Sequence, residues 1–374
     1  MPDPLASCDE INAYVANRIG FIELERPKAL NALSAPMIHA MHAALERWRN
    51  DPDVVAVIVR SPHPRAFCAG GDVRALYEAW QRDEHAAIDT FFIDEYRLNH
   101  AIFTYPKPYL ALTQGIVMGG GMGISQGAHR TGGLRIVTDS TRIAMPETRI
   151  GLFPDVGVSW FFARTPGAIG RYLAVTGSTF QATDALYAGL ADAYLTDDAV
   201  PALLDTLRSE VFELGADVVD CVLRECAVHH ATLATTTSTL AASRARIDRH
   251  FAKPDVKQIL ASLETETDDE DRDWAEQVIG LMRERSPLSM EVSLEVVTRS
   301  EGTMSDCLRR DLDLTRSSFA RGDVIEGIRA ALVDKDNRPQ WRIGRIEDVT
   351  PELVTGMFES PWSASEHPLR DLTG

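Results

Sequence analysis

Two carboxylates lie within one apolar segment of the chain. Glu147 and Asp155 both fall in residues 144–157, where Met, Ile, Leu, Phe and Val are frequent neighbours. An apolar environment raises the pKa of a carboxyl group, which suits it to proton transfer near neutral pH. A surface loop with two hydrated acids is the alternative, and the scarcity of other polar residues in the segment weakens it. Glu147 and Asp155 are therefore candidate acid–base groups.

Two glycine-containing segments could bind an anion through backbone N–H groups. Residues 65–72 read Arg-Ala-Phe-Cys-Ala-Gly-Gly-Asp and lie between an apolar strand and a helix expected over residues 73–80. The glycines free the backbone, and the N-terminus of the helix directs N–H groups outward. An oxyanion or phosphate site and a simple tight turn are equally compatible with this short pattern.

The second glycine segment is denser. Residues 119–123 hold four glycines in five positions, and ordering so many glycines costs much conformational entropy. A helix start rarely needs them unless a ligand must approach the backbone closely. The segment lacks the Gly-Lys-Ser/Thr ending of a Walker loop and the strand–GxGxxG–helix context of a dinucleotide site.

The remaining titratable candidates are weaker. Glu95 shares a helical stripe with Phe91 and Leu98, and periodicity alone favours a place at the edge of that stripe over one lining a pocket. The adjacent His229 and His230 have no acidic or cysteine partner at ligand spacing, so we expect no metal site. Cys68 reads as a small buried apolar residue rather than a nucleophile.

The elements that must position these residues follow an alternating pattern. Strands are expected in residues 13–24, 54–59, 109–112 and 136–137, and a helix begins after Ser34, a plausible N-cap. This alternation predicts an α/β region. Beyond residue 203 helical patterns dominate, with helices expected over residues 290–299 and 306–321. The acidic run at residues 264–273 reads as a solvated loop or helix start.

Three consecutive regions follow from this reading. We expect an α/β core with the active site over residues 10–202, a mainly helical region over residues 203–350, and an irregular tail over residues 351–374.

Composition narrows the classes of function. The 374 residues carry 38 Lys and Arg against 55 Asp and Glu, a net charge of −17. That charge disfavours nucleic acid and anionic membranes as partners, although a small anionic ligand needs only a local site. The five dispersed cysteines fit a reducing compartment. With no signal-peptide pattern at Met1 to Pro4 and no apolar run long enough to span a membrane, we expect a soluble, cytoplasmic protein.

Taken together, these segments resemble the crotonase superfamily of enoyl-CoA hydratases and isomerases, over roughly residues 15–355. The superfamily motifs are residues 25–33, 66–72 and 115–121. Within it the likeness is greatest to the branch that hydrolyses 3-hydroxyisobutyryl-CoA, a step of valine catabolism. The segments that resemble this branch are residues 92–96 and 105–108, residues 118–123, residues 145–157, and residues 319–341.

The resemblance implies a fold, a substrate and roles for single residues. The fold would be a spiral of ββα units with a helical C-terminal region, and the substrate a short β-hydroxyacyl-CoA thioester, with no cofactor beyond the coenzyme A of that substrate. The backbone N–H groups of Ala69 and Gly120 would form an oxyanion hole, Glu147 would be the main catalytic carboxylate, and Asp155 and Glu95 would be accessory acids. The residues implied in CoA binding are Arg26, Lys28, Leu30, Ala66, Gly70, Gly71 and Asp72. A homo-oligomer is left open, since crotonase relatives often form trimers or hexamers.

Two departures from the superfamily pattern stand out. Hydratases carry a second glutamate shortly after the triple glycine, and here Gly123 stands in that place. Hydration of an enoyl double bond uses two positioned acids, so the loss of one favours thioester hydrolysis. The stretch over residues 124–140 is also a few residues longer than the family norm. An enoyl-CoA hydratase or isomerase remains the enzymatic alternative, and a non-catalytic acyl-CoA-binding protein the non-enzymatic one.

Overall fold

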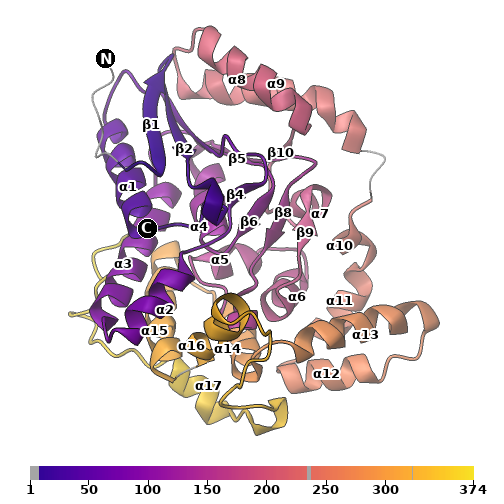
Figure 1. Ribbon diagram of the computed structural model, residues 1–374. Coiled ribbons are helices and arrows are strands. Elements are labelled where there is room, and N and C mark those ends of the chain that lie inside the picture. The colour runs from indigo at the N-terminus through magenta and orange to yellow at the C-terminus, as the bar shows by residue number, and fades with distance from the viewer. Residues whose placement is uncertain (1–7, 234–236, 322) are drawn as a thin grey trace. The chain divides into compact units, whose positions relative to one another are not determined.

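The computed structural model describes residues 8–233, 237–321 and 323–374 (Figure 1), so the Met1 to Pro4 pattern lies outside the described residues. The chain forms two compact units, each made of three stretches. Unit 1 comprises the residues up to Gly71, Asp94–Ile143 and Thr179–Ala241; unit 2 comprises Asp72–Ile93, Ala144–Ser178 and Ala242–Gly374. The three consecutive regions expected from the sequence do not coincide with this division, because helices beyond residue 203 complete the core of unit 1.

Unit 1 is built on two sheets, and among the described residues they contain six and four strands. The first has the order β1 (Ile11–Ala16), β2 (Ile19–Leu24), β3 (Ala56–Arg60), β5 (Tyr109–Thr113), β7 (Leu134–Val137) and β10 (Ala193–Tyr194). Its strands are parallel from β2 onward. The second has the order β4 (Ala66–Cys68), β6 (Ile116–Met118), β8 (Arg142–Ala144) and β9 (Phe180–Gln181).

The prediction of one continuous strand over residues 13–24 is wrong, because the segment contains a turn. These residues form the antiparallel hairpin of β1 and β2, with Ala16 paired to Ile19. The two residues of the turn, Asn17 and Arg18, have φ angles of +49° and +62°, the conformation of the tight hairpin turns that match strand twist. Asparagine favours this conformation but arginine at the second turn position is uncommon, so the pair Asn17-Arg18 is a weak turn signal.

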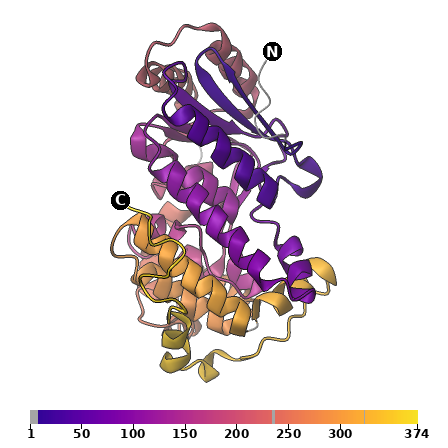
Figure 2. The same cartoon turned by 90° about the vertical axis from the view of Figure 1, so that its left-hand side faces the viewer.

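Helix α1 (Ala35–Arg49) covers one face of the larger sheet. Ser34 caps it as expected, with its hydroxyl accepting a hydrogen bond from the Met37 N–H. Trp48 on the buried stripe packs so closely on β2 that a Cβ at Gly20 would lie 2.5 Å from its ring. Glycine at that position therefore lets the helix approach the sheet. Figures 1 and 2 show α1 running beside the hairpin.

Helices α8 (Val200–Ser209) and α9 (Gly215–Leu233) cover the opposite face of this sheet (Figure 1). Their apolar side chains, among them Leu203, Leu207 and Val222, share one buried cluster with Phe21 and Ile58 of the strands. Because residues alternate in direction along a strand, Gly20 and Phe21 face the two different helix layers. The expected α/β layering is thus confirmed for unit 1.

The helices of the two units have the following bounds. Those wholly in unit 1 include α1, α4 (Gly120–Gln126), α7 (Ala182–Tyr187), α8 and α9, with the 3-10 turns η1 (Pro27–Ala29), η2 (Gly127–Thr131) and η4 (Asp197–Ala199). Those wholly in unit 2 include α2 (Val73–Gln81), α5 (Val158–Phe162), α6 (Ile169–Thr176), α11 (Arg244–Phe251), α12 (Val256–Glu264), α13 (Asp269–Arg283), α14 (Pro287–Thr298), α15 (Met304–Arg321), α16 (Asp323–Ile328) and α17 (Pro351–Met357), with η3 (Glu147–Ile150), the π-helical turn η5 (Arg329–Val333) and η6 (Ile346–Asp348). Helices α3 (His85–Phe103) and α10 (Thr239–Ala242) each contain a boundary between units.

The C-terminal half is helical, as predicted. The helices expected over residues 290–299 and 306–321 are α14 and α15, each extended at its N-terminus, and the acidic run leads into α13. The tail expected to be irregular contains α17, which Thr350 caps through its side chain. In the part of the chain that the structure describes, no helix has the length and apolar character that crossing a bilayer requires.

Candidate active site

The two glycine segments meet in unit 1 because their strands are neighbours. Strands β4 and β6 pair in parallel, so the loops that follow them leave the same edge of the sheet. A Cβ at Gly121 would lie 2.4 Å from the Cys68 carbonyl oxygen, and Gly70 has a φ of +110°. Only glycine permits so close an approach and this backbone conformation. The contact between residues 68–71 and residues 119–121 is called the glycine crossing below. The turn at residues 65–72 thus packs against the second glycine segment, and its role as an anion site stays a prediction.

Glu95 and Gly71 lie against Gly120 at this crossing. A Cβ at Gly120 would lie 2.4 Å from Glu95 Oε1 and 3.3 Å from the Gly71 nitrogen. Gly120 is the first residue of α4, so its N–H has no acceptor within the helix and is directed outward from the helix end. The structure thus brings three of the predicted site residues together.

The predicted role of Ala69 requires a correction. Its N–H donates to the Leu30 carbonyl oxygen at 3.0 Å, so this donor is already used inside unit 1. The N–H beside Gly120 is instead that of Gly71, two residues further along. The sequence motif identified the loop. Which of its N–H groups donates to the Leu30 carbonyl oxygen depends on the path of the backbone, which the motif does not specify.

The expectation that Glu95 lies at the edge of its helical stripe is wrong. Its side chain is buried, with 2% exposure, because the glycine crossing packs against that face of α3. Cys68 is also fully buried, and this burial raises the pKa of its thiol to about 12. The thiol is therefore protonated at neutral pH, in agreement with its reading as a small apolar residue.

Asn31 organises this part of unit 1, although it was not among the residues predicted to form the site. Its amide Nδ2 donates to Ser61 Oγ and to the carbonyl oxygens of Ala66 and Phe67, at 2.8–3.1 Å. Its Oδ1 accepts the Arg26 N–H at 2.8 Å. The side chain is fully buried and the residue has a φ of +55°. An asparagine tolerates this conformation better than most residues, which is the signal that could have found it.

The residues implied in CoA binding have varied surroundings. Arg26 forms an ion pair with Glu10 at 2.7 Å and donates to the Ala32 carbonyl oxygen. Its guanidinium therefore stabilises the loop over residues 26–32. Lys28 is exposed, Leu30 is half-buried, and Ala66 is buried in β4. Asp72 belongs to unit 2, where its carboxylate caps α2 by accepting the Ala75 N–H at 3.1 Å.

Glu147 lies in unit 2 at the start of the turn η3. The turn is fixed on two sides, since the Thr148 carbonyl oxygen accepts the Ser286 N–H at 3.0 Å and a Cβ at Gly327 would lie 2.3 Å from Ile150. The Glu147 side chain has 7% exposure. A buried carboxyl on so tightly packed a turn is held in one place, which suits a catalytic role.

Asp155 follows on the next loop of unit 2, and its side chain has 4% exposure. The two residues after it, Val156 and Gly157, both have positive φ angles, and Gly157 caps the short helix α5. Both acids are therefore buried, so the alternative of two hydrated surface acids does not hold.

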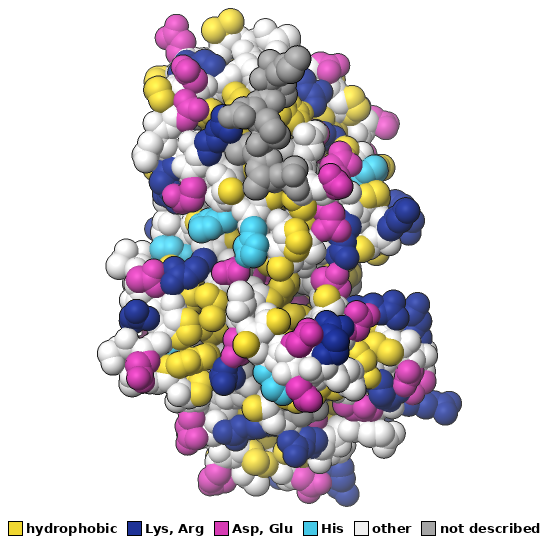
Figure 3. All heavy atoms as spheres, turned by 60° about the vertical axis from the view of Figure 1, so that its left-hand side comes forward, with side chains coloured by type: hydrophobic (Ala, Val, Ile, Leu, Met, Phe, Trp, Pro, Cys, Tyr) yellow, Lys and Arg dark blue, Asp and Glu magenta, His cyan; other side chains and the backbone are white. Residues whose placement is uncertain are grey.

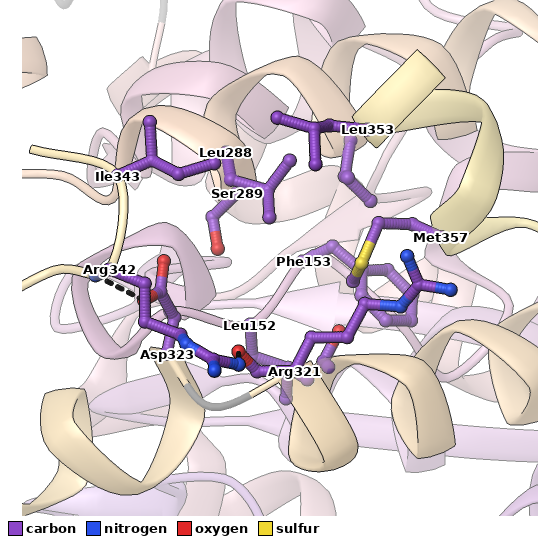
Figure 4. A pocket seen from close by; sticks show the side chains of 13 residues that line it. Leu152, Phe153, Leu288, Ser289, Arg321, Asp323, Arg342, Ile343, Leu353 and Met357 are labelled. Atoms are coloured by element: carbon purple, nitrogen blue, oxygen red, sulfur yellow. Dashed lines mark hydrogen bonds between the residues drawn. The ribbon is translucent and has the colours of Figure 1, made fainter. Parts of the chain in front are cut away.

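A cavity of about 360 Å³ lies nearby in unit 2 (Figure 4). Leu288 and Ser289 of α14 and Leu353 and Met357 of α17 line one part of it, and Leu152 and Phe153 belong to the segment between Glu147 and Asp155. Its polar groups already bond protein: Asp323 Oδ1 accepts the Arg342 N–H at 3.0 Å, and Arg321 donates to the Gly356 carbonyl oxygen at 2.8 Å. None of the predicted site residues lines this cavity.

Among the residues whose placement is described, no group of three His, Cys, Asp or Glu side chains has the arrangement of a metal site. The side chain of His230, one of the two adjacent histidines considered above, is not among the described side chains.

Comparison with known proteins identifies the family. The family model for enoyl-CoA hydratase/isomerase matches residues 19–358. The chain belongs to this family, and its fold of ββα units with a helical C-terminal region is the crotonase fold.

Relatives within the family are more specific. The chain is 35% identical over 347 residues to 3-hydroxyisobutyryl-CoA hydrolase, mitochondrial, of Xenopus tropicalis, covering 91% of this chain and 86% of that protein. It is 36% identical over 345 residues to the Rattus norvegicus protein of the same name, with the same coverage. A crystal structure titled as a carnitinyl-CoA dehydratase from Mycobacterium thermoresistibile has a TM-score of 0.82 and 36% identity, covering 94% of this chain and 97% of that one.

One expectation is overturned by these names. The vertebrate relatives are named as mitochondrial, which contradicts the cytoplasmic location expected from the sequence. Unpaired cysteines indicate a reducing environment but do not identify the compartment.

Proposed function

We propose that the protein hydrolyses a short β-hydroxyacyl-CoA thioester, 3-hydroxyisobutyryl-CoA, to 3-hydroxyisobutyrate and coenzyme A, a step of valine degradation. The observation that carries the proposal is the set of curated relatives with this activity in their names, 34–36% identical over 91% or more of the chain. Gly123, in the place of the second hydratase glutamate, supports it.

The oxyanion would be bound by backbone donors of unit 1. As water or a carboxylate attacks the thioester, the carbonyl oxygen becomes negative and needs fixed N–H groups near it. A Cβ built at Gly120 would lie 3.3 Å from the Gly71 nitrogen, so the N–H groups of Gly120 and Gly71 would bind the oxyanion together. One such donor is worth roughly 3 kcal/mol of transition-state stabilisation.

Glu147 of unit 2 would perform the chemical step. As a nucleophile it attacks the thioester carbonyl, the C–S bond breaks, and water then hydrolyses the mixed anhydride. As a general base it removes a proton from the attacking water. A single turnover in H₂¹⁸O distinguishes the general-base route, which places ¹⁸O directly in the product, from the nucleophilic route in which water attacks the Glu147 carbonyl carbon of the anhydride. In that nucleophilic route the ¹⁸O enters Glu147, and the first product carries none.

Two further acids would complete the reaction. Glu95 of unit 1 would accept a hydrogen bond from the substrate hydroxyl group. Asp155 of unit 2 would hold the same hydroxyl or give a proton to the departing thiolate of coenzyme A. Both side chains are buried. Water competes little for their hydrogen bonds there, so these bonds are stronger than on the surface.

The test is the substrate preference of the wild-type protein. We expect the kcat/KM for thiol release from 3-hydroxyisobutyryl-CoA to exceed the kcat/KM for hydration of crotonyl-CoA by about 100-fold or more. The specific observation that favours the alternative is the dehydratase title of the Mycobacterium structure. Loss of crotonyl-CoA absorbance without thiol release would establish that alternative. A protein that binds acyl-CoA but gives neither signal would support the non-catalytic reading.

A further inference from the structure

The loop that carries Asp155 has a strained backbone. Val156 has a φ of +53° and Gly157 a φ of +73°. A β-branched residue in the left-handed region is strained and stays there only where its surroundings hold it. A strained residue directly after a candidate catalytic acid therefore requires a neighbouring group that fixes the loop.

Asp311 of α15 is that group. Its Oδ2 accepts a hydrogen bond from the Gly157 N–H at 2.8 Å. The helix packs closely on the same glycine, since a Cβ there would lie 2.4 Å from Met304 Sδ. All of these residues belong to unit 2, so the contact is made within one compact body.

The surroundings of Asp311 favour its neutral form. The side chain has 0% exposure, and Oδ1 has no hydrogen-bond partner among the described residues. An ionised oxygen left dry and unpaired is costly, whereas a protonated carboxyl is tolerated. Burial raises the pKa of Asp311 to about 8.

The charged groups around Asp311 have opposing effects on its pKa. Arg310 lowers it, and Asp155 on the strained loop raises it. Arg310 donates to Ser159 Oγ at 3.1 Å and to the Arg299 carbonyl oxygen, so its charge is shared with other acceptors. The Cys307 thiol, one turn earlier on the same helix, faces Asp311 and has a raised pKa because it is buried.

We propose that Asp311 is a positioning residue for Asp155: as a neutral acid it fixes residues 154–157 through the Gly157 N–H and adds no second negative charge beside Asp155. This inference rests on the proposed hydrolase function, in which Asp155 acts on the substrate hydroxyl or the thiolate. Asp311 acts through the Gly157 N–H and need not touch the substrate.

Two substitutions separate the hydrogen bond from the charge. Asp311→Asn keeps an acceptor for the Gly157 N–H but cannot ionise. We expect its kcat for thiol release at pH 7 to stay within about two-fold of wild type. The wild-type kcat/KM should fall as pH rises through about 8, and Asp311→Asn should lack this decline.

Asp311→Leu removes the acceptor and leaves the Gly157 N–H unpaired. We expect kcat to fall about 10-fold or more with KM changed much less, at a temperature where circular dichroism shows the variant folded. Asp313→Asn is the matched control on the same helix, because its carboxyl bonds Ser360 and pairs with His367 instead. It can lower stability but should leave kcat and the pH profile unchanged.

Each outcome is decisive. An unchanged alkaline decline in Asp311→Asn, or a wild-type kcat in folded Asp311→Leu, overturns the positioning role. If the wild type itself releases no thiol, the proposed function fails, and urea unfolding then tests Asp311 alone. A neutral Asp311 requires the stability of the wild type to fall relative to Asp311→Asn from pH 5 to pH 8; a constant difference would contradict it.

Discussion

At the scale of single residues, the glycine crossing has little tolerance. Gly120→Ala would place a Cβ 2.4 Å from Glu95 Oε1, so either the carboxyl or the start of α4 must move. If Gly120 donates to the oxyanion as proposed, displacing its N–H should lower kcat for thiol release by about 100-fold, with a smaller effect on KM. Steady-state kinetics with 3-hydroxyisobutyryl-CoA measure both constants.

The matched control is Gly280→Ala, because nothing lies within 4 Å of a Cβ built at that position. In the last turn of α13 (Asp269–Arg283) this change should leave kcat unaltered and raise stability by up to about 0.5–1 kcal/mol. Equal losses of activity in both variants would mean that the crossing is not a special site.

Site residues could be predicted from the sequence where they stand in a short motif, and not where their role depends on contacts with distant parts of the chain. Glu147, Asp155 and Gly120 stand in motifs, and the structure buries the two acids and places Gly120 at a helix start. The choice between Ala69 and Gly71 was missed because it depends on a hydrogen bond to Leu30, 39 positions earlier in the chain. Asp311 was missed because it is far in sequence from the loop that it holds.

At the scale of elements, Asn31 joins the loop before α1 to strand β4. Asn31→Ala would leave the buried carbonyl oxygens of Ala66 and Phe67 without this donor. We expect a loss of about 2–3 kcal/mol in the free energy of unfolding by urea, together with lower activity because the adjoining donor loop moves. Asn50→Ala, at the exposed C-terminal end of α1, is the control and should change stability by about 0.5 kcal/mol or less. A similar small change in Asn31→Ala would rule out this bridging role.

The cap of α1 gives a second measurement at this scale. Ser34→Ala removes the acceptor for the Met37 N–H and should cost about 1 kcal/mol of stability. Ser34→Thr keeps the hydroxyl and should recover most of that loss. If both variants unfold at the same urea concentration as the wild type, the cap contributes nothing measurable.

Strong local patterns allowed most helices and buried strands to be predicted. Ser34 predicted the start of α1, and the apolar runs predicted strands β3 and β5. The hairpin of β1 and β2 was missed because Asn17 and Arg18 do not form a common turn pair. The composition of the two units was missed because the packing of α8 and α9 on the sheet is a long-range contact that periodicity does not specify.

At the scale of the whole molecule, the net charge of −17 excludes no local anion site. On the face shown in Figure 3, Lys and Arg side chains are interspersed with Asp and Glu side chains. The anionic substrate can therefore meet basic groups locally although the total charge is negative.

The stability of the molecule should depend on the charge of Glu291. Burial raises the pKa of Glu291, in α14, to about 7, and its Oε1 accepts the Val256 N–H at 3.0 Å. The folded state then holds this proton more tightly than the unfolded chain, so the contribution of Glu291 to stability falls as pH rises from about 4.3 through about 7 and levels off above about pH 8.

Glu291→Gln keeps an acceptor and removes this dependence. Relative to wild type it should gain stability between pH 5 and pH 7, by no more than about 3 kcal/mol, with a further gain of only about 0.4 kcal/mol by pH 9. Urea unfolding at the three pH values measures the difference, with the exposed Glu301→Gln as control. A difference that is independent of pH would show that Glu291 is ionised throughout.

The catalytic role of Glu147 is tested most directly by thiol release from 3-hydroxyisobutyryl-CoA by Glu147→Gln, measured beside the wild type and Glu301→Gln. We expect the wild type and Glu301→Gln to release thiol equally, and Glu147→Gln to be slower by about 100-fold or more while still folded. Thiol release by Glu147→Gln at the wild-type rate would exclude this role, because the buried carboxyl of η3 would then have no part in the hydrolysis.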